Sequence, residues 1–238
     1  MADKLHQIFL KNFSHFIETV EKLNETDPSK TIIYRGQTQD FPLLPSISRN
    51  NPTIDTTDVE VTAVEELKRR SRLKMNKDLI DDWDWLVFSQ HFGLRTRLLD
   101  WSSNPLVGLW FSCFDEEDWD KDGFLYALVV DDNVRLDRDK DKSPFERNRT
   151  RVYRPHLNNE RIVAQSGWFT AHGFSTSAKR FVRLDKNTLL KKYLTKFVIP
   201  KDLKLMFMEK LNLLGINYEK LFPDIEGICN QINFEFKL

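Results

Sequence analysis

The chain has 238 residues, of which 40% are hydrophobic and 12% aromatic, so it can build a sizeable core and is not a wholly disordered protein. Lys plus Arg and Asp plus Glu both number 36, and this zero net charge excludes a strongly basic nucleic-acid binder, although a local basic patch stays open. The two cysteines are far apart, which excludes a disulfide framework and a zinc-binding spacing. The low cysteine content favours a reducing cytoplasm, and the missing zinc spacing leads us to expect no metal. No apolar run reaches the ~18 residues that cross a membrane, so we expect no membrane contact.

The predicted elements begin with an amphipathic helix over 5–23, because apolar residues recur there at helical spacing. A strand over 31–35 follows, and Gly36 is expected to end it. Next come an ordered loop over 41–49 and helices over 58–75 and 78–92, the second with Gly93 as its cap. A polar loop over 93–103 leads to a buried helix over 106–114, a strand over 124–130 and a charged loop over 131–148. The remaining predicted elements are strands over 151–153, 168–171 and 194–199 and helices over 158–165, 201–214 and 223–230. Strands and helices do not alternate strictly, which favours an α+β fold.

The first candidate site is Tyr34-Arg35-Gly36-Gln37, at the end of the first predicted strand. Arg35 can point a permanent charge into a cleft, and its guanidinium suits a bidentate grip on phosphate or carboxylate. Gly36 would let a ligand approach the backbone closely. The alternative is that Arg35 forms a salt bridge to a neighbouring loop and only fixes the fold.

The second candidate site lies between residues 90 and 101, where polar groups are interspersed with hydrophobic ones. Arg97 and Asp100 form a natural ion pair, because buried charges need partners. His91, at the end of a predicted helix, could donate a proton or bind a ligand hydroxyl. The alternative is a structural histidine beside a structural Arg–Asp pair.

Two further candidates lie near the C-terminus. Gln165, in a turn between a predicted helix and strand, could hydrogen-bond an amide or a ribose. Asp224 and Glu226 stand in the first turn of the last predicted helix, where the helix dipole stabilises carboxylates. Asp224 is readily explained as a helix cap, whereas Glu226 is followed by Gly227, a poor helix former.

A basic stripe is the last candidate. In an extended chain Arg147, Arg149 and Arg151 share one face, and Arg154 is close by. Such a stripe could bind the phosphates of a nucleic acid or hold a protein acceptor. The alternative is a solvated strand edge whose charges prevent aggregation.

Together these segments resemble the FRG domain family, which is named for a Phe-Arg-Gly motif. Here the motif reads Tyr34-Arg35-Gly36-Gln37, so Tyr replaces Phe. The strongest similarity is Gln90-His91-Phe92-Gly93 with Thr96-Arg97-Leu98-Leu99-Asp100-Trp101 and Asn104-Pro105. Segments 41–49, 161–169 and 221–224 fit as well. The resemblance divides the chain into an N-terminal helix, residues 1–29, and an FRG domain, residues 30–238.

The resemblance implies an ADP-ribosyltransferase-like fold, with a split, mostly antiparallel sheet flanked by helices around a NAD cleft. It also implies an ADP-ribosyltransferase-like or NAD-cleaving enzyme, acting as a bacterial toxin or phage-defence effector. The catalytic residues would be Arg35 on the NAD phosphate or ribose, His91, and Glu226 on the nicotinamide ribose, with Asp100 as the alternative acid. The NAD-binding residues would be Tyr34, Gly36, Gln37, Ser46, Arg49, Gln90, Thr96, Arg97, Trp101, Gln165 and Phe169.

Two other functions stay open at this point. The same cleft could bind a nucleotide without chemistry, as a sensing module for nucleotides or nucleic acids. Alternatively, a metal-independent ribonuclease-type toxin could use His91 as its acid–base group and Arg97 as a phosphate clamp. In that case the stripe from Arg147 to Arg154 would hold RNA.

Overall fold

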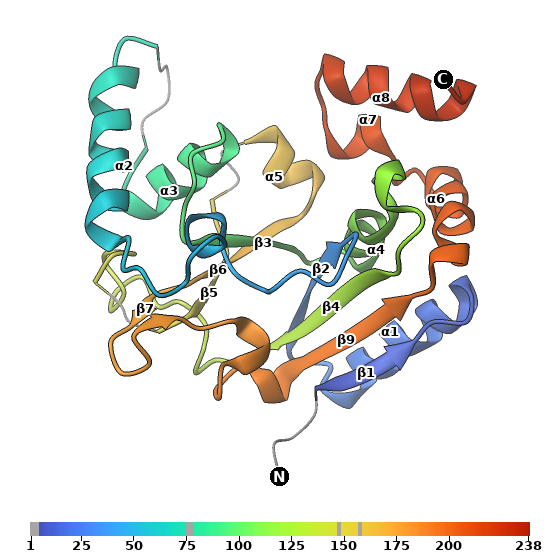
Figure 1. Cartoon of the computed structure of the whole chain (residues 1–238), viewed down its shortest axis with the longest axis horizontal. Coiled ribbons are helices and arrows are strands. Elements are labelled where there is room, and N and C mark those ends of the chain that lie inside the picture. Colours follow the sequence, from blue (N-terminus) through green and yellow to red (C-terminus); the bar gives the residue numbers. More distant parts are fainter. Residues whose placement is uncertain (1–4, 75–78, 147–148, 157–158) are drawn as a thin grey trace.

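A seven-stranded sheet forms the centre of the protein, as the computed structural model shows for residues 5–74, 79–146, 149–156 and 159–238 (Figure 1). Its strands are β1 (His6–Phe9), β2 (Thr31–Gln37), β3 (Leu98–Ser102), β4 (Gly123–Val130), β5 (Arg151–Tyr153), β6 (Gly167–Ala171) and β9 (Leu194–Ile199). The short strands β7 (Phe174–Ser175) and β8 (Arg180–Phe181) form a separate pair. The helices are α1 (Phe13–Thr26), α2 (Thr57–Ser71), α3 (Asp82–His91), α4 (Pro105–Cys113), α5 (Glu160–Ala164), α6 (Lys204–Leu213), α7 (Tyr218–Leu221) and α8 (Ile225–Phe236).

The strand order is β1-β9-β4-β2-β3-β6-β5, and β1 and β9 are parallel whereas the other neighbours are antiparallel. The predicted α+β class and the mostly antiparallel sheet are therefore confirmed. β2 pairs with β4 along its whole length, but it meets β3 at one register position, Tyr34 opposite Ser102. Beyond that position β2 and β3 are no longer paired. The sheet is therefore weakly joined between a first half, β1-β9-β4-β2, and a second half, β3-β6-β5.

Helices cover one face of the sheet. In the first half, α1, α4 and α6 bury Phe16, Trp110 and Phe207 against the face that carries Tyr34. Because Tyr34 is opposite Ser102, alternation along β3 puts Leu98 on the same face, where α2 and α3 pack against it. A core on the other face, which includes Trp101, is closed by loop residues. The junction of β2 and β3 therefore lies beneath a gap between two groups of helices.

Gly36 lets α4 lie directly on β2. A Cβ atom at this glycine would stand 2.1 Å from the carbonyl oxygen of Gly108 in α4, far inside van der Waals contact. β2 also continues through Gly36 to Gln37, so the prediction that Gly36 ends the strand is wrong. The close approach expected of a ligand is made here by the backbone of α4, which fixes the helix beside the junction of the sheet halves.

The largest differences from the predicted elements are two strands. The predicted helix over 5–23 begins only at Phe13, because residues before it pair with β9 as β1. The predicted polar loop over 93–103 contains β3, whose polar side chains are satisfied by tertiary contacts. The predicted helix start at Asn104-Pro105 is confirmed, and so is Gly93 as a cap, with φ of 87°. The expected helix ends at 75 and 78 and the helix start at 158 lie outside the described residues.

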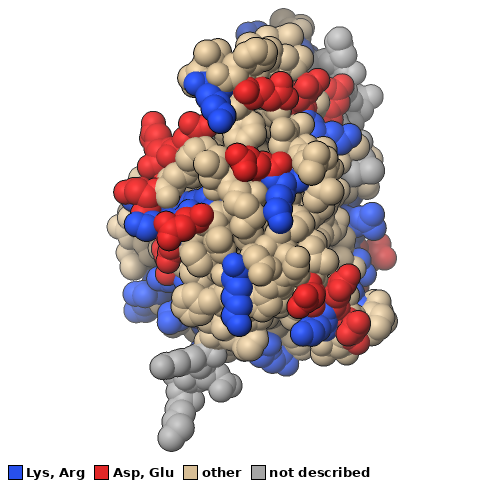
Figure 2. All heavy atoms as spheres, turned by 90° about the vertical axis from the view of Figure 1, so that its right-hand side faces the viewer, with Lys and Arg blue, Asp and Glu red and all other residues tan. Residues whose placement is uncertain are grey.

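The outer surface carries no strong bias of charge on the side drawn in Figure 2, where acidic and basic side chains are interspersed. This distribution agrees with the zero net charge of the chain. None of the helices in the described part of the chain has the length and hydrophobicity needed to span a bilayer.

Candidate functional site

A cleft of about 440 Å³ opens where β2 and β3 separate, between helices α3, α4 and α5. This volume is within the range of small-molecule sites. It is lined by residues of both sheet faces and by the segment after α7: Tyr34, Arg35, Gly36, Gln37, Thr38, Phe41, Arg49, Val87, Gln90, His91, Asp100, Trp101, Ser102, Val107, Phe111, Phe114, Arg161, Ile162, Gln165, Gly167, Trp168, Phe169 and Phe222. Most of the predicted site residues, including Arg35, His91 and Asp100, therefore meet around one cavity.

Arg35 bridges the gap between the two strands. Its Nη1 donates a hydrogen bond to the backbone oxygen of Asp100 at 2.8 Å and lies 3.9 Å from the carboxylate oxygen Oδ2. Its Nε is buried without a hydrogen-bond partner among the described residues. Burial lowers the pKa of Arg35, the Asp100 carboxylate opposes this shift, and the neighbouring charge of Arg49 adds to it. The charged guanidinium is thus only partly compensated by the protein.

A chain of hydrogen bonds holds the carboxylate of Asp100 in place. The hydroxyl of Thr96 accepts from the backbone N–H of Leu98 and donates to Oε1 of Gln90. This fixes the orientation of the amide, so that Nε2 of Gln90 donates to Oδ1 of Asp100 at 2.6 Å. Ser46 supports the chain from behind, because its hydroxyl accepts from the backbone N–H of Thr96. Ser46 and Thr96 do not line the cleft, and they position Gln90 and Asp100 rather than contact a ligand there.

Aromatic side chains form much of the wall. Tyr34 and Trp101 come from the strands, and further rings come from α4 and from the segment after α7. The guanidinium of Arg161 lies 4.7 Å above the ring of Phe222. His91, at the end of α3, lines the same cleft and has its ring edge against Phe92. The rings, together with the lining arginines Arg35, Arg49 and Arg161, suit a ligand that has both an aromatic group and negative charge.

The C-terminal segment is tied to α5 by polar contacts. Nε2 of Gln165 donates to the backbone oxygen of Leu221 at 3.1 Å, and Arg161 forms an ion pair with Asp224 at 3.2 Å. Asp224 also caps α8 by accepting from the backbone N–H of Gly227, which confirms the capping alternative. Glu226 is exposed in the first turn of α8 and is not among the residues that line the cleft. Of the two predicted acids, the structure brings Asp100 to the cavity.

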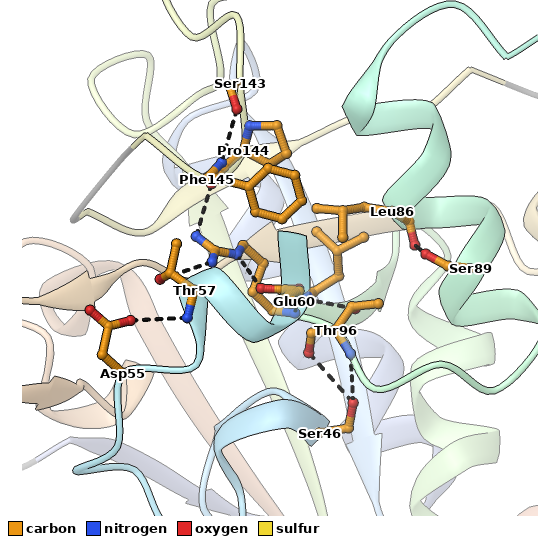
Figure 3. A network of polar contacts seen from close by, with 12 residues as sticks. Ser46, Asp55, Thr57, Glu60, Leu86, Ser89, Thr96, Ser143, Pro144 and Phe145 are labelled. Carbon is orange, nitrogen blue, oxygen red and sulfur yellow. Dashed lines mark hydrogen bonds and ion pairs between the residues drawn. The ribbon is translucent and has the colours of Figure 1, made fainter. Parts of the chain in front are cut away.

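The expected pair of Arg97 and Asp100 is wrong. Arg97 is 1% exposed, and its Nε donates to Oε2 of Glu60 at 2.6 Å while its backbone N–H donates to Oε1 at 2.7 Å. Nη1 of Arg97 donates to the backbone oxygen of Pro144, and Nη2 donates to the hydroxyl of Thr57 (Figure 3). Arg97 and Asp100 are three residues apart in extended chain, so their side chains point to opposite faces. Arg97 does not line the cleft, and a phosphate clamp there would have to break this buried network.

The wall behind Trp101 contains a buried histidine that the sequence did not single out. The indole N–H of Trp101 donates to the hydroxyl of Thr170 at 3.1 Å, and this oxygen lies 3.0 Å from Nε2 of His172. The oxygen of Thr170 thus connects the indole of Trp101 to the imidazole of His172. Burial, with the charges of Arg35 and Arg97 nearby, lowers the pKa of His172 to about 3. His172 is thus neutral at pH 7 and fixes one aromatic wall of the cleft.

The predicted basic stripe is not a uniform surface. Arg149 is exposed, whereas Arg151 donates to the backbone oxygen of Asn133 and Arg154 lies 5.5 Å from the ring of Trp168. Arg147 lies outside the described residues. A role in holding an acceptor or nucleic acid stays a prediction. Among the described residues, no group of three or more His, Cys, Asp and Glu side chains is placed to hold a metal ion.

Several residues of the site could not be found from the sequence alone. Glu60, the partner of Arg97, is one of many acidic residues on a charged helix. The apolar character of 106–114 predicted a buried helix, but gave no sign that Phe111 and its neighbour Phe114 line a cavity. Phe222 belongs to the segment 221–224 that fits the family, but its place in the cleft depends on the return of the chain after α6, a long-range contact without a local signal.

Comparison with known proteins supports part of the resemblance. Neither the curated proteins nor the solved structures contain a match to this chain. The model of the FRG domain family matches residues 30–121, which run from the start of β2 to the turn before β4. This segment supplies Arg35, Arg49, His91 and Asp100 to the cleft, so the FRG domain match contains the charged centre of the candidate site.

Proposed function

We propose that the cleft binds NAD and breaks the bond between its nicotinamide and ribose, as an enzyme of the ADP-ribosyltransferase-like class. The observation that carries this proposal is Arg35, whose buried Nε has no partner in the described part of the chain and whose guanidinium lies beside a fixed carboxylate in an aromatic cleft. A dinucleotide supplies what these groups need: anionic phosphates for the arginines, hydroxyls for the carboxylate and flat rings for the aromatic walls.

The phosphates are the groups that Arg35 and Arg49 would hold. Arginine suits this task because its planar fork matches two phosphate oxygens, and a partly buried arginine binds an anion more strongly than an exposed one. Arg161 is less available, since it pairs with Asp224 and lies over Phe222. Phosphate binding at Arg35 would place the adjoining ribose beside Asp100, whose carboxylate is 3.9 Å from the guanidinium.

The reaction needs a carboxylate near the ribose. When the glycosidic bond breaks, its electron pair leaves with the nicotinamide nitrogen, which becomes neutral, and C1′ becomes an oxocarbenium-like cation. Asp100 stabilises that positive charge. Water, or a nucleophile of an acceptor, then forms a new bond to C1′ and gives up its proton to the carboxylate. Gln90 holds the carboxylate in position throughout, so no reorganisation is needed during the step.

Replacing Arg35 by glutamine is expected to weaken NAD binding by about 10- to 100-fold, because a charge-assisted hydrogen bond contributes about 1.5–3 kcal/mol. Calorimetric titration of NAD into the wild type and R35Q measures this. Arg95→Gln is the matched control, since Arg95 is exposed and does not line the cleft. Equal affinity of R35Q and the wild type, with both folded, contradicts the proposed grip on phosphate.

Replacing Asp100 by asparagine is expected to reduce nicotinamide release by about 100- to 1,000-fold, the usual effect of removing one electrostatic group that acts in the transition state. NAD affinity should stay within a few-fold, because asparagine still accepts the bond from Gln90. Free nicotinamide is measured by chromatography after incubation with NAD, with Asp132→Asn on an exposed turn as control.

NAD binding, nicotinamide release and RNA cleavage together separate the proposed enzyme from its rivals. NAD that binds tightly to the wild type without any release of nicotinamide would favour the non-catalytic nucleotide-sensing module. Failure of the wild type to bind NAD would overturn the proposal. Cleavage of total cellular RNA by the wild type and not by His91→Ala would favour the ribonuclease-type toxin.

A further inference from the structure

Gln37 stands out among the polar residues of the cleft. It is the last residue of β2, it is 7% exposed, and it lines the cavity. Its side-chain Oε1 is buried and has no hydrogen-bond partner among the described residues. Buried polar atoms are nearly always paired in folded proteins, and leaving one unpaired is unfavourable.

The neighbouring residues show that the protein can satisfy polar groups in this segment. The hydroxyl of Thr38 and the amide of Gln39 both donate to the carboxylate of Asp118 at 2.5 Å. The backbone oxygen of Thr38 accepts from the buried ammonium of Lys204 at 3.0 Å. These contacts fix the chain directly after Gln37. The backbone that carries Gln37 is therefore fixed at the cavity wall, while its Oε1 lacks a hydrogen-bond partner among the described residues.

We propose that Gln37 determines specificity by pairing with a ligand group that presents a hydrogen-bond donor and acceptor side by side. The side-chain amide of Gln37 has an oxygen that accepts a hydrogen bond and a nitrogen that donates one. If the two atoms exchange places, the ligand must present its donor and acceptor in the reverse order, but it still needs both. A primary carboxamide has this pattern, and so does the N6/N7 edge of adenine, to which glutamine binds through two hydrogen bonds.

The position of Gln37 fits such a role. Arg35 and Gln37 are two residues apart on β2, so their side chains share one face about 7 Å from each other. A ligand whose phosphate is held by Arg35 can thus extend one further group toward Gln37. This inference rests on the proposed function, because NAD carries both groups: a carboxamide on nicotinamide and an N6/N7 edge on adenine.

The test uses three dinucleotides that differ at one group each: NAD, its analogue with a carboxylate in place of the carboxamide, and its analogue with hypoxanthine in place of adenine. Each is titrated calorimetrically into the wild type, Gln37→Leu and Gln37→Glu. Gln7→Glu, on the exposed strand β1, is the control for folding and net charge. Thermal unfolding of each variant confirms that it is folded.

We expect the wild type to bind one analogue about tenfold more weakly than NAD, and Gln37→Leu to lose this discrimination, as removal of one satisfied hydrogen bond predicts. Weak binding of the carboxylate analogue identifies the carboxamide as the group that Gln37 reads, and weak binding of the hypoxanthine analogue identifies adenine. If NAD binds and Gln37→Leu keeps the discrimination, the role of Gln37 is overturned and the proposed function survives. If the wild type binds none of the three, both are overturned.

Discussion

Replacing Glu60 by glutamine is expected to lower the free energy of unfolding by about 3–5 kcal/mol, the usual effect of breaking one partner of a buried ion pair. Glu60 and Arg97 are each 1% exposed, and both carboxylate oxygens accept bonds from Arg97. A glutamine amide offers one acceptor and one donor. Whichever way it is turned, an N–H group faces an N–H group of Arg97, whose charge stays buried without compensation.

The same helix offers a matched control. Glu65 of α2 forms an ion pair with Lys68 at 2.6 Å, but its side chain is 63% exposed. An exposed pair of this kind contributes about 0–1 kcal/mol, so Glu65→Gln should leave the stability nearly unchanged. Urea unfolding followed by tryptophan fluorescence compares the two variants. Equal, small effects for both would contradict the importance of the buried pair.

A double variant tests the cause of the loss. Glu60→Met and Arg97→Met each leave one buried charge alone, whereas the combination removes both charges and fills the space with apolar atoms. We expect the double variant to be more stable than either single one. Full additivity of the two losses would show that packing rather than uncompensated charge explains them.

This network also connects the stability of the fold to the candidate site. Arg97 is directly followed by β3, and Glu60 anchors that point to α2. Thr96, on the other side of Arg97, orients Gln90 and through it the carboxylate of Asp100. Residues 96 and 97 thus serve one purpose each: the first positions the acid of the cleft, and the second fixes the strand that carries it.

The parts of this arrangement that could be predicted have local causes. Asn104 and Pro105 start α4 because a side-chain cap and a fixed φ act within a few residues. β3 was missed because its polar residues look like a loop, whereas in the fold they are satisfied by distant partners. The strand β1 was missed because its apolar residues also fit a helical period, and its pairing with β9 decides between the two.

The candidate site divides in the same way. Arg35 was predicted because a permanent charge at the end of an apolar strand can point into a cleft, whereas Asp100 entered as the alternative acid through the resemblance to the FRG domain family. The pairing of Arg97 was predicted wrongly, because Asp100 was chosen as the nearest acid in sequence and the period of a strand was not applied to a segment assigned as loop. Glu60 lies 37 residues away, so only the fold brings it to Arg97.

Acidification below pH 6.5 is expected to destabilise the protein through His172, which is 1% exposed. Burial, aided by the charges of Arg35 and Arg97, lowers the pKa of His172 from 6.5 to about 3. The unfolded chain binds a proton below pH 6.5, while the folded chain stays neutral at this site until about pH 3. Stability is therefore complete above pH 6.5 and is lost as the pH falls, by about 1.4 kcal/mol per pH unit and about 5 kcal/mol in total.

The measurement is urea unfolding at pH 7 and pH 5, an interval in which the depressed aspartate and glutamate groups, such as Asp118, contribute little change. The wild type should lose about 2 kcal/mol over this interval. His172→Gln keeps a hydrogen-bonding partner for Thr170 and should flatten the slope, whereas His6→Gln, on the exposed strand β1, should not. An unchanged slope in His172→Gln would show that this histidine is not the group whose protonation unfolds the protein.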